Sequence, residues 1–430
     1  MKSILLRIKK RLGVARAFNK ELRQWHRLKS RIEPCKADRR HLVIVPCDPG
    51  SVGGSRGDEA MIMGVINKYR SKFPQIPVSI VCSDEKGISY VTQFPIGGVQ
   101  SIASWNGNYP LERIYTSIIN AHPSDVVILG ADCMDGYYSP LISLTLLALH
   151  ELSASTPGIS SCLLGFSFNA KPYRLLKYAY NRLGGNVIIN LRDRVSLSRF
   201  TRFTSKEAGL VADAAFMLQP NYGFEGYGRL EEWVKDKRRN GAQIVMGMNF
   251  HPMLRSYSGK DDIISDALII AKNVARILRE RTDIVFVFIP HDDRSQLTDN
   301  LMLGEMYKYL SDCGLDDRVY YEQHVYRADQ LKGLCRLLDG IVSSRMHLAI
   351  AALGQGKSVM AASYQGKFEG LFDHFKIPHK YILSANKFIS SEMVDCFGDY
   401  VSNLEALNTV VARSLPNVIQ LSKNNINSNQ

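Results

Sequence analysis

Short apolar runs rich in β-branched residues recur along this chain, and helical patterns separate many of them. This alternation constrains the fold more than any other feature. The helical patterns are clearest at residues 264–280, 297–312 and 329–338. Continuous apolar runs are typical of parallel strands buried on both faces, and their alternation with helices predicts an α/β fold with parallel sheets. The runs are HLVIVPC (41–47), VSIVC (78–82), DVVILG (125–130), SCLLGFSF (161–168), NVIINLR (186–192), QIVMGMN (243–249), DIVFVFIP (283–290), RVYYEQ (318–323), GIVSS (340–344) and SVMAAS (358–363).

One stretch, QPNYGFEGYG at 219–228, interrupts this alternation with Pro, Asn and spaced Gly residues and shows no apolar period. A chain of 430 residues has room for two or three domains. We therefore expect two Rossmann-like domains, 41–222 and 223–390. Their parallel sheets should face each other across a cleft, with ligands at the carboxyl ends of the strands. A basic arm should precede them (1–40), and a C-terminal helix with a polar, disordered tail should follow (391–430).

The predicted arm holds most of the net charge of +13, because residues 1–40 contain 14 Lys and Arg but only 3 Asp and Glu. Its apolar residues Ile4, Leu5, Ile8 and Leu12 fall at helical spacing. Two readings stay open: a solvated basic tail, or an amphipathic helix on an anionic membrane surface. A transit peptide also fits this composition. No nucleic acid is expected as a partner, since no recognisable nucleic-acid-binding module accompanies the charge.

Hydropathy and cysteine usage bear on the compartment. The longest apolar run, Leu141–Leu149, is too short to cross a bilayer, and no apolar segment of a secretory signal follows the basic start. The eight cysteines form no C-x-x-C pair, and several lie in predicted buried strands. They indicate reduced core cysteines without a metal site or disulfide framework. We expect a cytoplasmic protein, peripheral on the inner face of the membrane if the arm binds there.

The loop after the first apolar run is rich in glycine and leads into a helix at Gly57, Asp58 and Glu59. A carboxylate in a first helical turn accepts hydrogen bonds from free N–H groups and complements the helix dipole. This structural role is enough to explain an aspartate at position 58. The glycines would also let a ligand approach the backbone. The loop matches neither a P-loop nor a G-x-G-x-x-G fingerprint, so it predicts no nucleotide.

A second candidate is NLRDRVSLSRF (190–200), which places Arg192 at a strand end and Ser196 in the following helix. The planar guanidinium of Arg192 could bind an anion in the cleft. It could equally form an ion pair with Asp193 or Asp213, and the local sequence does not decide between these.

The most informative stretch is SSRMHLAIAALGQGKSVMAASYQGKFEGL (343–371). Arg345 and His347 fall in the first turn of a helix that follows a strand, and Lys367 precedes another helix after the next strand. Cations at helix N-termini oppose the helix dipole, so their placement indicates an anionic ligand that also uses the helix ends. Neighbouring strands would direct all three side chains towards a small, highly charged anion such as a phosphate, with or without a carboxylate.

These motifs resemble the polysaccharide pyruvyl transferase family. The resemblance rests on RGDEAM (56–61), LRDRVS (191–196), VADAAFML (211–218) and, above all, the 343–371 stretch, in which Arg-x-His, an Ala/Gly-rich helix and Tyr-x-x-Lys occur together. It covers roughly residues 41–385. The chain departs from the family at ADCMDGYYSP (131–140), where many members have a run of glycines.

The resemblance implies a GT-B-like enzyme that transfers the pyruvyl group of phosphoenolpyruvate to two hydroxyls of one sugar, forming a cyclic ketal and releasing phosphate. His347 would be the general acid, and Arg192, Arg345 and Lys367 would bind the donor. Acceptor-binding or loop-structuring roles would fall to Asp58, Ser196 and Tyr364.

No metal and no cofactor besides the donor substrate is expected. The acceptor would be a sugar or a lipid-linked oligosaccharide used in polysaccharide biosynthesis. Two alternatives stay open: a GT-B glycosyltransferase that uses a nucleotide sugar, and a non-catalytic sugar-binding descendant of the fold.

Overall fold

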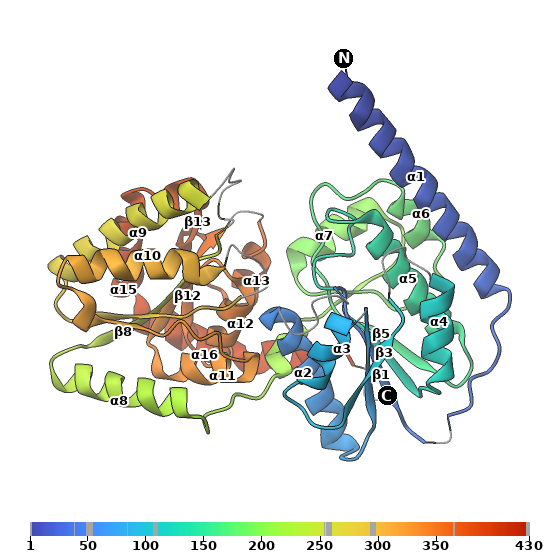
Figure 1. Ribbon diagram of the computed structural model, residues 1–430, viewed down its shortest axis with the longest axis horizontal. Helices are drawn as coiled ribbons and strands as arrows, with labels where there is room; N and C mark the ends of the chain where they lie inside the picture. Colours follow the sequence, from blue (N-terminus) through green and yellow to red (C-terminus); the bar gives the residue numbers. More distant parts are fainter. Residues whose placement is uncertain are drawn as a thin grey trace. The chain divides into compact units, whose positions relative to one another are not determined.

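The computed structural model describes residues 2–37, 39–48, 55–83, 85–105, 111–252, 254, 260–292, 298–363 and 366–426. The chain forms two compact units (Figure 1). The first comprises Met1–Gly53, Met61–Met217 and Gln420–Gln430, and the second comprises Gly54–Ala60 and Leu218–Ile419. The units are therefore not contiguous in sequence, because the segment that opens α2 belongs to the second.

The first unit is built on a parallel five-stranded sheet of order β3-β2-β1-β4-β5, and a parallel pair, β6-β7, lies outside it. The strands are β1 (Leu42–Val45), β2 (Val78–Cys82), β3 (Val99–Ala103), β4 (Asp125–Ile128), β5 (Ser160–Leu163), β6 (Asn190–Leu191) and β7 (Gly209–Leu210). The helices are α1 (Lys2–Lys29), α2 (Arg56–Lys72), α3 (Glu85–Thr92), α4 (Leu111–Asn120), α5 (Pro140–Ser155), α6 (Leu176–Asn181), α7 (Arg194–Phe203) and the 3-10 turn η1 (Ala214–Met217).

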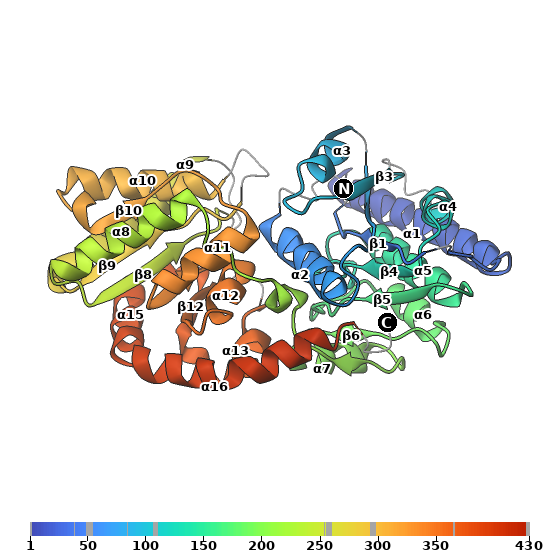
Figure 2. The ribbon, with the colours of Figure 1, turned by 90° about the horizontal axis from the view of Figure 1, so that it is seen from below.

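The second unit contains a parallel six-stranded sheet of order β10-β9-β8-β11-β12-β13, with helices on both faces (Figure 2). Its strands are β8 (Ile244–Asn249), β9 (Ile284–Phe288), β10 (Val319–Tyr321), β11 (Gly340–Ser343), β12 (Ser358–Ser363) and β13 (Ile382–Ser384). Its helices are α8 (Glu225–Arg239), α9 (Lys260–Glu280), α10 (Asp299–Asp312), α11 (Ala328–Leu334), α12 (Met346–Leu353), α13 (Glu369–Phe375), α14 (Ala385–Phe388), α15 (Glu392–Ser402) and α16 (Leu404–Lys423), with the 3-10 turns η2 (Asp316–Arg318), η3 (Cys335–Leu337) and η4 (His379–Tyr381).

Both large sheets have the strand order of a Rossmann-like fold, so the predicted α/β class with parallel sheets is confirmed. In each sheet the strand order reverses at one position, between β1 and β4 in the first unit and between β8 and β11 in the second. Ligands of open α/β sheets bind outside the carboxyl ends of the strands at such a switch point. These two strand ends are therefore the places where functional residues are expected.

The prediction of a separate arm over residues 1–40 is wrong for α1 from Phe18 onwards. Phe18 and Trp25 are almost completely buried, Glu21 is buried beside them, and α1 packs against α4 and α5. Lys29 also donates to the carboxylate of Glu151, with Nζ and Oε1 2.7 Å apart. The spacing of Phe18, Glu21 and Trp25 puts all three on one face of the helix, and that face is part of the core.

The prediction of a disordered C-terminal tail is wrong as far as Ile426, beyond which residues 427–430 lie outside the described part of the chain. Ser422, Asn425 and Ile426 are buried in the first unit. The Asn425 side chain accepts from Gly165 N–H at 2.6 Å and donates to the Ala212 carbonyl at 2.7 Å. Polar residues of this tail therefore form hydrogen bonds with buried backbone groups. Composition alone does not show whether such residues bind backbone groups or water.

Within the described ranges, no helix has the length and hydropathy required to cross a bilayer. Among the described residues the eight cysteines form no disulfide bond, and five of them are buried.

Candidate active site

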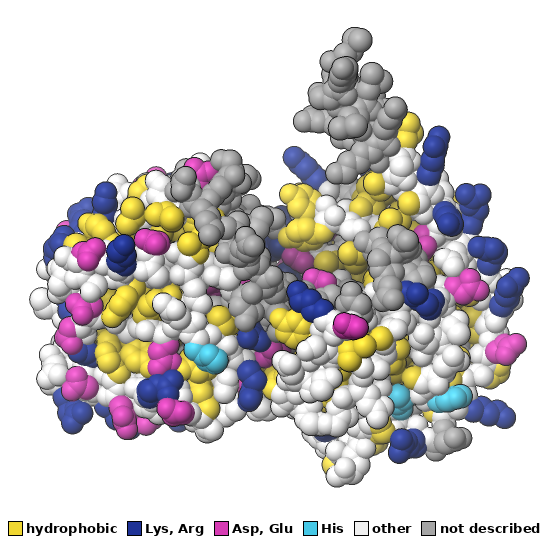
Figure 3. Space-filling model, viewed as in Figure 1, with side chains coloured by type: hydrophobic (Ala, Val, Ile, Leu, Met, Phe, Trp, Pro, Cys, Tyr) yellow, Lys and Arg dark blue, Asp and Glu magenta, His cyan; other side chains and the backbone are white. Residues whose placement is uncertain are grey.

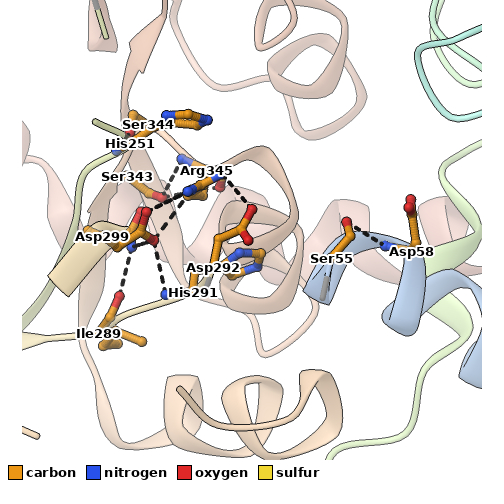
Figure 4. A network of polar contacts seen from close by, with 11 residues as sticks. Ser55, Asp58, His251, Ile289, His291, Asp292, Asp299, Ser343, Ser344 and Arg345 are labelled. Atoms are coloured by element: carbon orange, nitrogen blue, oxygen red, sulfur yellow. Dashed lines mark hydrogen bonds and ion pairs between the residues drawn. The ribbon is translucent and has the colours of Figure 1, made fainter. Parts of the chain in front are cut away.

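Polar residues concentrate at the switch point of the second unit, where the carboxyl ends of β8, β9 and β11 lie side by side (Figure 4). Asn249 is the last residue of β8, His291 and Asp292 follow β9, and Arg345 follows β11. The Ser344 N–H donates to the Asn249 carbonyl at 3.3 Å, and the Ser344 hydroxyl accepts from His251 N–H at 2.5 Å. The loops that leave β8 and β11 are thus fastened to each other.

Asp299, the first residue of α10, is the centre of this network and is fully buried. Its carboxylate accepts from the guanidinium of Arg345, with Nη2 at 2.5 Å and Nε at 3.2 Å from Oδ1. It also accepts from Asn249 Nδ2 at 2.8 Å and from His291 N–H at 3.0 Å. A buried carboxylate requires such compensation, and here β8, β9 and β11 all supply it.

Arg345 has a second carboxylate partner, because Nη1 donates to Oδ2 of Asp292 at 3.0 Å. Its backbone N–H donates to the Ser343 hydroxyl at 3.0 Å, and the residue is the N-cap of α12, as the sequence predicted. Arginine carries five N–H donors. Among the described residues, three of these N–H groups donate to Asp299 and Asp292. The other two, one on each Nη, are left for a ligand.

His347 lies in the first turn of α12 and contacts the start of α2. A β-carbon placed on Gly57 would lie 2.2 Å from Nδ1 and 2.6 Å from Cε1 of the His347 ring. Only glycine leaves room for the imidazole at this position. The absence of a side chain at Gly57 therefore makes room for the imidazole of His347.

The first turn of α2, which belongs to the second unit, makes further contacts within that unit. Glu59 accepts from Ala328 N–H at 2.7 Å and from Arg56 at 2.8 Å, and Arg56 also donates to the Val325 carbonyl at 3.3 Å. Burial raises the pKa of Glu59. Asp58 is buried in the same turn, and its N–H donates to the Ser55 hydroxyl at 3.3 Å. The predicted site residue Asp58 thus lies in the same unit as Arg345 and His347.

His291 belongs to this group but was missed from the sequence. It is buried, and its Nδ1 has no hydrogen-bond partner among the residues that the structure describes. Burial is the main cause that lowers its pKa well below the usual range, and the charge of Arg345 adds to the effect. The signal was available, since His291 and Asp292 directly follow a predicted strand.

Lys367 follows β12, the strand next to β11, and is half-buried two residues before α13. Parallel neighbouring strands place Lys367 at the same edge of the sheet as Arg345 and His347, as predicted. Gly366 precedes it with φ of 63°, and its N–H donates to the Ser363 hydroxyl at 3.3 Å. Tyr364 lies outside the described residues.

Arg192 and Ser196 belong to the first unit and form structural contacts there. Arg192 is buried and donates to Asp213 at 3.1 Å, one of the two ion pairs that the sequence left open. Ser196 accepts from Phe168 N–H at 3.0 Å and donates to Asp193 at 2.8 Å, while Asp193 caps α7. These contacts hold the first turn of α7 to the segment after β5, and Arg192 to Asp213. The proposed ligand-binding roles of both residues stay predictions.

Within the described part of the chain, no group of three or more His, Cys, Asp or Glu side chains is arranged to hold a metal ion.

Several solved structures are similar to this chain over most of its length. A UDP-N-acetylglucosamine 2-epimerase from Neisseria meningitidis is 13% identical with a TM-score of 0.52, covering 90% of this chain and 98% of that one. Another UDP-N-acetylglucosamine 2-epimerase is 12% identical with a TM-score of 0.54, covering 90% and 94%. A UDP-forming trehalose-phosphate synthase from Burkholderia xenovorans is 9% identical with a TM-score of 0.52, covering 90% and 97%. At these identities the likeness shows the fold alone, which is of the GT-B type.

Sequence comparison is more specific. A search of curated proteins gives no significant match. The family model for polysaccharide pyruvyl transferases matches residues 56–366, which is most of the chain.

Proposed function

The chain belongs to the polysaccharide pyruvyl transferase family, and we propose that it transfers the pyruvyl group of phosphoenolpyruvate to two hydroxyls of one sugar, closing a cyclic ketal. The observation that carries this proposal is the group formed by Arg345, His347 and Lys367. These three residues follow two neighbouring strands, β11 and β12, beside the switch point of the second unit. We assign this unit to the donor and the first unit to the acceptor.

The donor is an anion with a phosphate and a carboxylate, and the cations of the site fit it in different ways. Lys367 contributes a point charge. Asp292 and Asp299 neutralise Arg345 but also hold its fork in place, so its two remaining N–H groups would act as oriented hydrogen-bond donors. The role of Arg192 as a further donor ligand stays a prediction, because Arg192 lies in the first unit and pairs there with Asp213.

The reaction balances with the donor and a sugar diol alone. A proton from His347 goes to the methylene carbon of phosphoenolpyruvate, and an oxocarbenium-like centre forms at the adjacent carbon. One sugar hydroxyl adds there and loses its proton. The C–O bond to phosphate then breaks, and the second hydroxyl adds and closes the ring. Of the two hydroxyl protons, one replaces the proton that His347 gave, and the other leaves with inorganic phosphate. No further cofactor enters this scheme.

The decisive experiment incubates the full chain with phosphoenolpyruvate and a panel of methyl pyranosides. Mass spectrometry should find a product heavier by one pyruvate ketal, and a phosphate assay should find one phosphate released per product. Release of UDP from UDP-sugars, without use of phosphoenolpyruvate, would instead identify a glycosyltransferase. The absence of both activities on lipid-linked as well as free sugars would leave a non-catalytic sugar-binding protein.

We also propose that α1 binds an anionic membrane surface from the cytoplasmic side. The exposed cations Arg16, Lys20, Arg23 and Arg27 recur every three to four residues, so they form a stripe on the face opposite Phe18 and Trp25. Figure 3 shows Lys and Arg side chains along the outer side of this helix. Cationic residues of this kind are attracted to anionic lipids. The burial of Phe18 and Trp25 means that the docked helix would adhere by charge, without inserting these side chains.

A further inference from the structure

The loop between β4 and α5 carries a pair of exposed tyrosines at the switch point of the first unit. Tyr137 and Tyr138 are 54% and 53% exposed, and their rings meet edge to face with centroids 5.3 Å apart. The loop leaves the carboxyl end of β4, the strand beside β1 where the strand order reverses. The pair thus lies where an open α/β sheet binds its ligand.

The backbone that presents this pair is rigidly held. The buried carboxylate of Asp135 accepts from Tyr137 N–H at 2.8 Å and from Asn169 N–H at 2.9 Å. Gly136 has φ of 76°, and a β-carbon there would lie 2.7 Å from the Cβ of Tyr173. Tyr180 also donates to the Met134 carbonyl at 2.8 Å. The loop is therefore built to hold two partly exposed aromatic rings at a fixed position.

A polar group accompanies the rings, because the hydroxyl of Tyr138 donates to Oδ2 of Asp132 at 3.3 Å. Small-molecule sites combine aromatic surface with a few fixed polar groups, and a tyrosine ring supplies contact area with little loss of side-chain entropy. The apolar C–H face of a pyranose fits against such a ring, and its hydroxyls can donate to a carboxylate. The negative charge of Asp132 disfavours a phosphate and favours a neutral sugar.

We infer that Tyr137, Tyr138 and Asp132 form a subsite for a neutral pyranose ring of the acceptor. This inference deepens the proposed function and rests on it for the identity of the ligand as the acceptor. The two tyrosines provide the stacking surface, Asp132 accepts from a sugar hydroxyl, and Asp135 positions the loop. Discrimination among acceptors would then depend on this loop.

The test measures sugar binding separately from catalysis. Saturation-transfer NMR is recorded on the full chain with methyl pyranosides of glucose, galactose and mannose, without phosphoenolpyruvate. Transfer to the ring C–H protons of at least one glycoside is expected, and it should be lost in Tyr137→Ala and Tyr138→Ala. Tyr138→Phe should keep the stacking but bind less tightly. The matched control is Tyr178→Ala, which removes a comparably exposed tyrosine (43%) from α6 of the same unit.

In steady-state assays, each alanine variant should raise the acceptor KM about tenfold, as expected for the loss of one stacking contact, and leave the donor KM unchanged. Equal transfer in wild type and both alanine variants, or no transfer from any glycoside to wild type, overturns the subsite. Failure of the proposed function is distinguishable, because sugar binding that depends on Tyr137 and Tyr138 without any use of phosphoenolpyruvate would support the subsite and refute the reaction.

Discussion

The imidazole of His347 lies so close to the α-carbon of Gly57 that a methyl group on Gly57 would come within 2.2 Å of Nδ1. The two residues are far apart in sequence, yet both belong to the second unit. This contact makes the first turn of α2, at Gly57, one wall of the position that His347 occupies. The placement of the proposed acid therefore depends on a residue with no side chain.

The first prediction concerns His347 itself. Replacing His347 by Gln keeps a polar side chain but removes the proton donor, so kcat should fall by roughly 10²–10⁴-fold, the usual range for general acid catalysis. The donor KM should change much less. Phosphate release with saturating phosphoenolpyruvate and acceptor is the measurement. Near wild-type kcat in this variant would refute the assignment of His347 as the acid.

The second prediction uses the contact with Gly57. Gly57→Ala should lower kcat by about 100-fold, because the added methyl group displaces the imidazole and misplacing a catalytic group by about 1 Å can cost that much. Thermal stability should change little, since a side chain can rotate away from the clash. The matched control is Gly398→Ala in α15, where a β-carbon meets nothing within 4 Å. Full activity in Gly57→Ala would show that the position of His347 is not critical.

Much of the site was predictable from single residues at strand ends. Arg345, His347 and Lys367 were identified because cations at helix starts oppose the dipole, and the structure places them after the neighbouring strands β11 and β12. Their partners were not predicted. Asp299 lies within a helical pattern and His291 in a connecting loop. The order of strands in the sheet brings Asp299 to the guanidinium of Arg345 and to the N–H of His291, and sequence does not show this order.

Buried strands were predicted correctly from the sequence, whereas an exposed edge strand was not. The buried strands β2 and β12 have the predicted bounds, because continuous apolar runs mark them without ambiguity. The strand β3 was missed, since it is an edge strand whose residues Gln100 and Ser101 are exposed. The helix α1 was read as a free arm because the basic residues of one face dominate its composition, whereas Phe18 and Trp25 determine its packing.

The third prediction distinguishes a residue that positions Arg345, Asp299, from a residue that binds the donor directly, Lys367. Asp299→Ala leaves Arg345 with one carboxylate and removes a fully buried acceptor, so it should destabilise the protein by about 3–5 kcal/mol. Lys367→Ala removes a half-buried cation, so it should raise the donor KM while the melting temperature stays nearly unchanged. Thermal unfolding and donor titration distinguish the two effects. Equal donor affinity in Lys367→Ala and wild type would place Lys367 outside the donor site.

The fourth prediction is a pH dependence from Glu21 on α1. Burial raises its pKa to about 7, and the Thr145 hydroxyl at 3.4 Å compensates only partly. The folded state therefore binds a proton more tightly than the unfolded chain. Stability from this group is fully present below its ordinary pKa of 4.5, and it is lost as pH rises to about 7. The loss should be on the order of 3 kcal/mol.

Glu21→Gln should remove this dependence, because the amide is neutral at every pH. Unfolding free energies from pH 5 to 8 should decline less steeply in Glu21→Gln than in wild type, with the variant more stable at pH 8. Glu33→Gln, at an exposed position on the same N-terminal segment, is the control and should follow wild type. Parallel curves for wild type and Glu21→Gln would contradict the raised pKa.

The last prediction tests the basic stripe of α1 without removing the helix. Deleting residues 1–39 would expose the surface of α4 and α5 that Phe18 and Trp25 cover, so loss of membrane binding in that truncation would be ambiguous. Replacing Arg16, Lys20, Arg23 and Arg27 by Gln keeps the buried face. Each cation near an anionic surface contributes about 1 kcal/mol, so the four should together weaken binding by about three orders of magnitude.

Sedimentation with phosphatidylserine-containing liposomes at low salt is the measurement, because screening should release even the wild-type protein as salt rises. The control replaces four exposed lysines elsewhere, Lys86, Lys171, Lys177 and Lys308, and so makes the same change in net charge. If binding follows the stripe, the α1 variant stays in solution and the control sediments with the liposomes. If both variants lose binding equally, net charge is responsible and α1 is not a specific membrane contact, whereas sedimentation of both would show that these four residues are not needed.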